Sequence, residues 1–491
     1  MKHNHHLNHN QESDQEPNQA SGQQYGHPHD QQSGHAHGHH MNRQPNNSHI
    51  ELMSSAPVSK AIIRMSIPVI LGMLVQMLYN LVDTFFIGLL HDENQLAAAS
   101  ITTPIFMLQM AIATIVSTGA SSYISRCLGR KDTEKANRTL ATGVLLCVIL
   151  GAIFSAGGLI AIKPLVVGLG ASEAVYPYAF KYVSIMLLGS IPVMLNYAGG
   201  QLIRAEGAMM ASVMGMLVGT VTNIILDPLF IFAFDMGMSG AALATVLGNL
   251  AALIYYVIYY RSGKSQLVLK LKNISREGDI WKEIFTIGVP ACMNQLLLSI
   301  ATIILNNLIG NDDILKAGMG ISSKLFFIAT YIFMGFAAGC QPLIGFNYGA
   351  KNYTRVKSIF KTGMLMTFCI GLTFLAVFWL LAPNMIGFFT PLQDVRDAGT
   401  MVLRINILCL IVLGPQMLTT TGIQALGRAK EALILSVARQ GIFYIPLLFI
   451  MKQVAGIKGL IFAQPIADAL TFVLGLIFLA AIFKKVLKPQ E

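Results

Sequence analysis

The feature that most constrains this chain is a series of about twelve apolar segments, each long enough to cross a lipid bilayer. A helix rises about 1.5 Å per residue, so roughly 20 apolar residues span the hydrocarbon core. Only 12% of the residues are charged and 54% are hydrophobic, against about 25% charged in an ordinary soluble domain. We therefore predict an all-α polytopic protein embedded in a lipid bilayer. The predicted spans are 66–90, 96–125, 138–161, 178–202, 208–234, 238–260, 282–310, 315–345, 358–382, 399–423, 431–451 and 456–483.

The formal net charge of +10 indicates membrane topology rather than a nucleic-acid partner. Basic residues gather in alternate loops, around 126–138, 261–276 and 351–361, and the intervening loops are poor in them. Positive residues favour the cytoplasmic side, so we expect both termini in the cytoplasm and a cytoplasmic (inner) membrane location. The six cysteines lie in or near predicted spans and form no CxxC pair, a pattern typical of small core residues.

Residues 1–55 differ sharply from the rest, because they are rich in Gln, Asn, His and Ser and have little to bury. We predict a disordered cytoplasmic tail there. Its histidines could bind a metal ion weakly. The alternatives are a low-complexity tail without a metal, or a translation start placed too early, with Met41 or Met53 as the true initiator. No predicted span contains a histidine, which disfavours a transporter of metal cations built on histidines within the membrane. The candidate metal ligands of the tail are His35, His37, His39 and His40.

The membrane part contains an internal repeat of about 220 residues. The repeat pairs Gly129 with Gly349 and Gly207 with Gly427. Six spans in each half is an even number, so the halves share one orientation and are related by an axis along the membrane normal. The matched segments are 125–146 with 346–366, 203–214 with 424–435, and 237–244 with 456–463. The predicted division is an N-terminal six-helix lobe (56–265), a cytoplasmic linker (266–280) and a C-terminal six-helix lobe (281–491).

Two aspartates lie inside predicted spans of the N-terminal half. Asp83 belongs to the 25-residue segment 66–90, which extends for about 37 Å as a helix. Asp227 lies in an equally apolar segment, and the repeat places Leu305 opposite Asp83 and Ile445 near Asp227. A carboxylate at this depth costs several kcal/mol unless it is protonated, paired or hydrated. The two acids therefore indicate an ion or substrate pathway in the N-terminal half.

The residues around Asp227 suit a small cation. Asn223 precedes it by four positions, so both side chains share one face of a helix. Pro228 follows and cannot donate to the carbonyl of Ile224, which predicts a helix bend and a free backbone oxygen. Within a membrane that oxygen needs protein, water or an ion. The cluster fits Na⁺ or a proton with water, and the alternative that Asp227 caps a broken helix stays open.

Two hydroxyl groups extend this cluster. Tyr79 precedes Asp83 by one helical turn, and Thr245 belongs to the next span after Asp227. Either hydroxyl can bond a carboxylate, or simply join neighbouring helices. In the C-terminal half the ionisable residues within predicted spans are Lys324, Arg439 and Asp468. They are expected to pair across the helix bundle or to take part in gating.

Taken together, these motifs resemble the multidrug and toxic compound extrusion (MATE) family, in the DinF-type branch with MepA-like proteins. The resemblance covers residue 55 to the C-terminus. It departs from NorM-type members, whose acids in the C-terminal half have no secure match here. The motifs that carry it are VDTFFIG (82–88), SRCLGRKD (125–132), RAEG (204–207), NIILDP (223–228) and GAALAT (240–245).

The resemblance implies a secondary antiporter and not an enzyme. It implies H⁺- or Na⁺-coupled export of drug-like, bulky amphipathic or cationic compounds, with a role in antibiotic resistance, by alternating access between two lobes. We expect a monomer without cofactor. By resemblance the coupling residues are Asp83, Tyr79, Asn223, Asp227 and Thr245, and Pro68 is a point where the first span bends. The alternatives are a flippase for a lipid-linked or polysaccharide precursor, whose cavity needs arginine and lysine, and a sensor that uses the histidine-rich tail.

Overall fold

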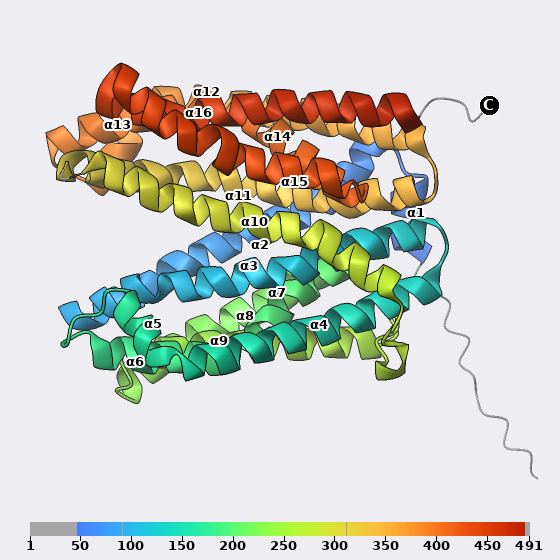
Figure 1. Ribbon diagram of the computed structural model, residues 1–491, viewed down its shortest axis with the longest axis horizontal. Coiled ribbons are helices and arrows are strands. Elements are labelled where there is room, and N and C mark those ends of the chain that lie inside the picture. The colour runs from blue at the N-terminus through green and yellow to red at the C-terminus, as the bar shows by residue number, and fades with distance from the viewer. Residues whose placement is uncertain (1–46, 91, 311, 487–491) are drawn as a thin grey trace, which may run out of the picture. The chain divides into compact units, whose positions relative to one another are not determined.

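The computed structural model describes residues 47–90, 92–310 and 312–486, and confirms the predicted all-α fold (Figure 1). Two π-helices, η1 (Leu229–Ala233) and η3 (Ala438–Tyr444), and one 3-10 helix, η2 (Leu271–Asn273), accompany the α-helices. The α-helices are α1 (Asn47–Ser54), α2 (Val58–Gly88), α3 (Glu93–Gly129), α4 (Thr133–Ile160), α5 (Ile162–Gly168), α6 (Tyr176–Leu188), α7 (Ser190–Ala205), α8 (Met209–Pro228), α9 (Met238–Arg261), α10 (Gly278–Ile309), α11 (Asp313–Gly349), α12 (Tyr353–Phe389), α13 (Gln393–Ile407), α14 (Leu410–Ala425), α15 (Ala429–Val437) and α16 (Ile445–Val486).

The number of spans agrees with the prediction of about twelve. Among the described residues, nine helical stretches are long and apolar enough to cross a membrane. Two more spans are bent pairs, α6 with α7 at 54° and α13 with α14 at 49°. One of the nine, Ala429–Lys485, contains Gly456 with φ 62° and ψ −146°, where two helices meet. Counting that stretch as two spans gives twelve.

The bend in the fourth span is stabilised by side chains from a neighbouring helix. α6 ends at Leu188 and α7 begins at Ser190. Gln109 of α3 donates from Nε2 to the carbonyl oxygen of Met186 and to the Ser190 hydroxyl, both at 2.9 Å. Irregular backbone at membrane depth is tolerated only where protein or water satisfies its polar groups. A buried glutamine therefore makes this bend possible.

The predicted end of the disordered tail at residue 55 is wrong, because residues 47–54 form α1. The reason is apolar burial: Ile50 and Leu52 pack against the main core, and Met53 has no exposed surface. The polar composition of residues 1–55 as a whole led to a prediction of disorder, although this short segment contains apolar residues. The four candidate metal ligands, His35, His37, His39 and His40, lie outside the described residues.

The first span of each half packs across the boundary between the halves. α2 contacts α11 of the C-terminal half as well as α8, and α10 contacts α3 of the N-terminal half as well as α15. In Figure 1 the remaining helices of the N-terminal half lie in the lower part of the bundle and those of the C-terminal half in the upper part. α2 and α10 therefore link the two groups.

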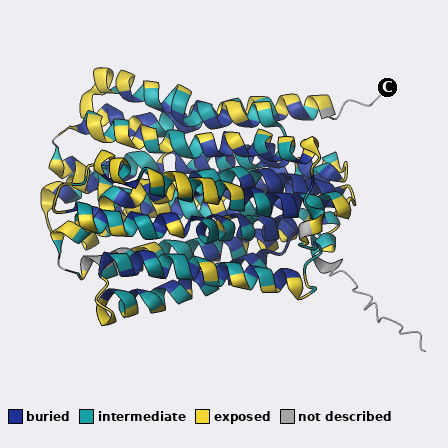
Figure 2. Cartoon of the chain, turned by 60° about the horizontal axis from the view of Figure 1, so that its bottom comes forward, coloured by how far each residue is buried: buried dark blue, intermediate teal, exposed yellow. Residues whose placement is uncertain are grey.

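The halves are in closest contact at the end of the bundle where α1 lies and α16 ends, here named the terminal face. Gly129 has no room for a Cβ beside the Phe346 carbonyl, and Gly349 has none beside the Arg126 carbonyl. The repeat pairs these two glycines, so the contact is reciprocal, as a pseudo-twofold axis requires. Figure 2 shows that buried residues are densest toward this face.

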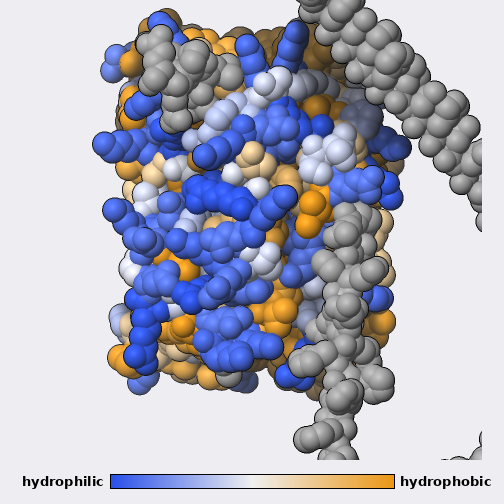
Figure 3. Space-filling view, turned by 90° about the vertical axis from the view of Figure 1, so that its right-hand side faces the viewer, coloured by the Kyte–Doolittle hydropathy of each residue, from blue (hydrophilic) through white to orange (hydrophobic). Residues whose placement is uncertain are grey.

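Polar contacts reinforce this closure. Arg126 of α3, whose side chain is 5% exposed, forms an ion pair with Glu283 of α10 at 2.9 Å. Ser122 Oγ donates to the carbonyl oxygen of Gln424 at 2.6 Å. The surface of the terminal face is rich in hydrophilic side chains (Figure 3). The terminal face is thus closed between the halves and polar outside.

Candidate functional site

Close backbone packing of α8 on α9 builds the centre of the site. Gly248 of α9 lies against the Gly219 carbonyl and the Cβ of Asn223, which leaves no space for a side chain. This approach brings Asn223 beside Thr245. Asn223 is buried, and Asp227, one turn further along α8, has an exposed fraction of 0%. Two polar residues of α8 therefore sit in the interior of the N-terminal half.

Hydrogen bonds join four of the five predicted coupling residues. The Asn223 amide donates from Nδ2 to Asp227 Oδ1 and to Thr245 Oγ1, each at 3.4 Å. The Tyr79 hydroxyl from α2 is hydrogen-bonded to Thr245. The site thus combines side chains from α2, α8 and α9.

Several oxygens at this site lack a donor. Asp83 Oδ1, Asn223 Oδ1 and Asp227 Oδ2 are buried and have no hydrogen-bond partner among the described residues. Buried polar atoms are usually satisfied, so an unsatisfied acceptor calls for a missing donor, water or ion. Three acceptors without donors make this region electron-rich and ready to receive a cation.

A small polar cavity of about 40 Å³ is lined by Asn223, Tyr79 and Thr245, whereas neither Asp83 nor Asp227 lines it. A water molecule needs roughly 10–15 Å³ of such space, so the cavity has room for water. Three further amides, which were not predicted from the sequence, also line it: Gln76, Asn196 and Asn249. Each is an amide inside an apolar span, a signal that the sequence carries, whereas Asn223 was selected by its spacing from Asp227. The cavity lining comprises Gln76, Tyr79, Asn196, Met216, Gly219, Thr220, Asn223, Thr245, Gly248 and Asn249.

Two of the added amides form a chain that leads to the cluster. Asn196 of α7 donates from Nδ2 to Asn249 Oδ1 at 2.7 Å. Asn249 in turn donates to the carbonyl oxygen of Thr245, also at 2.7 Å. The chain connects α7 to α9 and fixes the turn of α9 that presents the Thr245 hydroxyl.

Asp83 lies one turn beyond Tyr79 on α2 and does not line the cavity. It is close enough to Asp227 for the two carboxyl groups to interact electrostatically. Tyr182 of α6, also missed from the sequence, lies within electrostatic range of both acids. The structure therefore brings the two acids close to each other. The cavity wall beside them includes Tyr79, Asn223 and Thr245.

The two prolines behave differently. α2 continues through Pro68 as a single helix. Pro228 ends α8, and the chain passes directly into the π-helix η1. π-helical turns are frequent at functional sites and arise where the regular helical hydrogen bonding is interrupted. The irregular backbone beside Asp227 follows from the proline.

In the C-terminal half the predicted pairing involves two of the three ionisable residues. Arg439 Nε of η3 donates to Asp468 Oδ1 of α16 at 2.8 Å. Gln464 donates to the same oxygen at 3.1 Å. Lys324 forms no ion pair with any residue that the structure describes. The buried acid of this half is thus neutralised by a neighbouring arginine.

Comparison with known proteins bears on this arrangement. The sequence profile of the MatE family matches residues 68–229 and 290–450, one stretch in each half. The multidrug export protein MepA of Staphylococcus aureus (strain MSSA476) is 32% identical over 406 residues, which is 82% of this chain and 90% of that protein. MepA of Staphylococcus saprophyticus subsp. saprophyticus is 30% identical with the same coverage.

Solved structures are similar over almost their whole length. One is described as the outward-facing conformation of a multidrug resistance MATE family transporter of the MOP superfamily, with a TM-score of 0.85, 26% identity, and coverage of 90% of this chain and 99% of that chain. Another is a MOP superfamily transporter from Pyrococcus furiosus whose reversed pocket polarity is said to suggest a different function. Its TM-score is 0.84 at 26% identity, and it covers 90% of this chain and 99% of that chain.

Proposed function

This chain belongs to the MatE family, and from that premise we propose that it is a cation-coupled antiporter for bulky amphipathic or cationic compounds. H⁺ or Na⁺ moving inward drives the compound outward across the cytoplasmic membrane. The coupling residues are Asp83, Asp227, Asn223, Tyr79 and Thr245. One observation carries the proposal: the three buried acceptor oxygens of Asp83, Asn223 and Asp227 have no donor among the described residues.

The proposed coupling passes through α2. This helix carries Tyr79 and Asp83 to the site and also packs against α11 of the other half. Arrival of a cation at Asp83 or Asp227 neutralises buried charge and changes how strongly α2 is held against α8. Because α2 touches both halves, the change reaches the boundary between them. We propose that the halves act as two lobes, with the first span repacking around Pro68.

The conformation described above corresponds, in this proposal, to an outward-facing state with both termini in the cytoplasm. Two findings support it. The terminal face is closed by the Gly129–Phe346 and Gly349–Arg126 contacts, and the fold matches an outward-facing relative at a TM-score of 0.85. The basic loops on the same side favour a cytoplasmic location for that face.

The energetics suffice for useful export. A membrane potential of about 150 mV is worth roughly 3.5 kcal/mol per elementary charge, or about 300-fold in concentration. Entry of one H⁺ or Na⁺ therefore drives efflux of a neutral compound. One-for-one exchange against a monovalent cationic drug is electroneutral, so the concentration gradient of the coupling ion must drive it.

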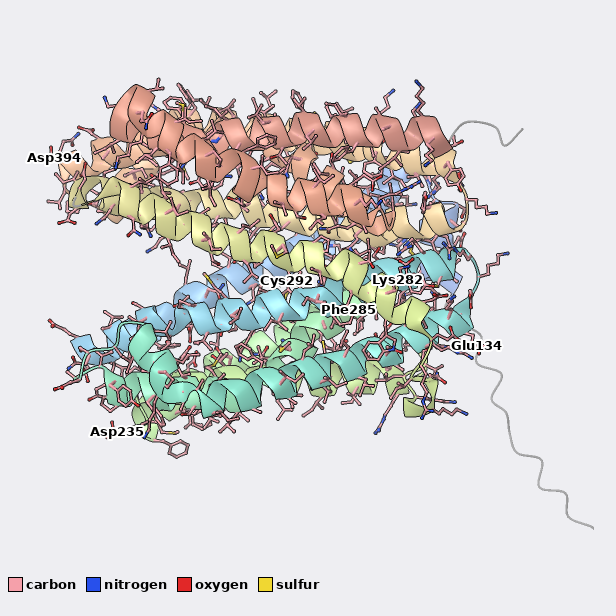
Figure 4. The ribbon with its side chains drawn as sticks, viewed as in Figure 1. Glu134, Asp235, Lys282, Phe285, Cys292 and Asp394 are labelled. Atoms are coloured by element: carbon pink, nitrogen blue, oxygen red, sulfur yellow. The ribbon has the colours of Figure 1, made fainter. Side chains whose placement is uncertain are left out.

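The test is efflux of a fluorescent cation from proteoliposomes, with H⁺ and Na⁺ gradients imposed separately. We expect one gradient to drive transport and the double variant Asp83→Asn with Asp227→Asn to lower the rate at least tenfold. Asp235→Asn is the matched control, because Asp235 is an exposed acid of the same half, near the end opposite the terminal face (Figure 4). We expect that control to transport at the normal rate.

Efflux that survives the double substitution would sink the mechanism. No response to either gradient by a folded protein, together with binding of lipid pyrophosphate instead of organic cations, would favour a flippase. Binding of a drug with no gradient-driven movement would point to a carrier that lacks ion coupling.

A further inference from the structure

The short helix α1 lies at the closed terminal face, and its fold depends on what it touches. Eight residues are too few for a stable isolated helix in water, so tertiary contacts must hold it. Met53 near its end has no exposed surface, and Ile50 and Leu52 pack against the main core. The opposite side of the helix carries the exposed Glu51.

The C-terminal half holds α1 by one carbonyl group in its last turn and by one just beyond its end. Asn347 of α11 donates from Nδ2 to the Met53 carbonyl oxygen at 2.9 Å. Arg355 of α12 donates from Nε to the same oxygen at 3.2 Å and from Nη2 to the Ala56 carbonyl oxygen at 2.6 Å. The final carbonyls of a helix lack intrahelical partners and carry partial negative charge. The guanidinium of Arg355 supplies both a hydrogen-bond donor and a positive charge at this helix end.

The N-terminal half holds the same helix by its side chains. Gly207, with φ 86°, forms the turn between α7 and α8. The space beside its Cα is filled by α1: a Cβ there would lie 3.1 Å from Met53 Cε and 3.4 Å from His49 Cβ. Met53 thus contacts the N-terminal half through its side chain and the C-terminal half through its carbonyl.

The two halves close this face in different ways at matched turns. The repeat pairs Gly207 with Gly427, and both have positive φ. At Gly427 the covering group is the guanidinium of Arg126, which reaches across from α3. With Gly129 paired to Gly349, the counterpart of Arg126 is Phe346, which offers no charge. At Gly207 the covering group is instead Met53 of α1.

We propose that α1 is a built-in clasp, which joins the two halves at the terminal face and must release one of them before that face opens. The proposal rests on the alternating access proposed above. A segment that contacts both halves in the closed state and only one in the open state stabilises the closed state by the difference in its contacts. α1 therefore favours the closed terminal face.

Cys340 is a native reporter of opening at this face. It is fully buried where α11 meets α2, with its Sγ 3.9 Å from the Ser66 hydroxyl. Separation of the halves exposes it. Cys409 is buried in the core of the C-terminal half and reports unfolding. Mass spectrometry of tryptic peptides gives the N-ethylmaleimide labelling rate of each.

The experiment compares two shortened chains in proteoliposomes. One starts at residue 57 and lacks α1, and its matched control starts at residue 44 and keeps α1. We expect the rate of Cys340 labelling to rise at least fivefold without α1 and to stay at the full-length value in the control. An equal rise in both chains would place the effect in residues 1–43 and overturn the clasp.

If the shorter chain unfolds and exposes Cys409, a point variant tests whether α1 keeps the terminal face closed. Met53→Ala in the full chain removes the buried side chain and should raise Cys340 labelling about threefold. Glu51→Ala on the exposed side of α1 should leave it unchanged. A rate for Met53→Ala equal to that of the full chain would overturn the proposal. Labelling requires neither substrate nor ion gradient, so failure of the antiport mechanism leaves this test intact.

Discussion

The N- and C-terminal halves have buried polar groups at matched positions, but they differ in whether a buried acid is paired with an arginine. The match of 237–244 with 456–463 sets Thr245 opposite Gln464 and Asn249 opposite Asp468. In the C-terminal half the buried acid, Asp468, accepts from Arg439 at 2.8 Å and from Gln464 at 3.1 Å. One oxygen of Asp468 also lacks a donor, but the guanidinium supplies the opposite charge.

Among the residues that the structure describes, no arginine forms an ion pair with Asp83 or Asp227 of the N-terminal half. Asp227 accepts only the 3.4 Å hydrogen bond from Asn223, and one of its oxygens is unsatisfied among the described residues. A carboxylate with a fixed counter-ion does not need to take up a cation, whereas one without a counter-ion does. One scaffold thus holds an acid with a fixed counter-ion in one half and, in the mechanism proposed above, an exchangeable acid in the other.

The largest effect should come from breaking the ion pair of the C-terminal half. Arg439→Met leaves Asp468 buried without its counter-ion, and loss of one partner of a buried pair costs about 3–5 kcal/mol. We expect the midpoint of thermal unfolding in detergent to fall accordingly. Adding Asp468→Asn to Arg439→Met should restore part of the loss. A midpoint equal to that of the unsubstituted protein would contradict the structural role of this pair.

A second difference between the halves concerns the turn after the fourth span, where Glu206 stands in the N-terminal half and Leu426 in the C-terminal half. Burial raises the pKa of the Glu206 carboxyl to about 7 from 4.5, although it accepts hydrogen bonds from Ser265 and the Gln266 N–H. The unfolded carboxyl ionises first, so stability present below pH 4.5 is lost as the pH rises through about 7.

A difference of about 2.5 between the two pKa values corresponds to about 3 kcal/mol. We expect the midpoint of thermal unfolding of the unsubstituted protein to fall from pH 5 to pH 8. In Glu206→Gln this decrease should be smaller, because a neutral amide keeps an acceptor and does not ionise. Leu426→Gln provides a control at the matched turn. An identical pH dependence with and without Glu206 would show that this carboxyl does not set it.

The smallest expected effect is a change in stability whose sign differs between the two halves. Asp227→Asn removes a buried charge that no counter-ion balances, so we expect stability to increase by about 1–2 kcal/mol, a common gain when a functional site is relieved of strain. Asp468→Asn, the same substitution in the other half, should decrease stability because it leaves Arg439 unpaired. Thermal unfolding midpoints at pH 8 check both. A decrease in both variants would show that the halves do not differ in this way.

The sequence by itself determined the twelve spans, the repeat and the two acids of the N-terminal half. The reason is that the ability to cross a membrane depends on apolar length, which is a local property of the chain. The cost of a buried carboxylate is equally local, so Asp83 and Asp227 stood out against their surroundings. The i to i+4 spacing of Asn223 and Asp227 fixed their common helix face without any tertiary information.

Only the tertiary structure decided which distant groups meet. It bent the fourth span around Gln109, brought Asn196 and Asn249 to the cavity wall, and left both acids off that wall. It paired Arg439 with Asp468, and it placed α1 against both halves at the terminal face, where Met53 is buried beside Gly207. These outcomes depend on how helices far apart in the sequence pack together. Local apolar pattern therefore predicted the elements, packing of helices within the N-terminal half built the site, and packing between the halves closed the terminal face.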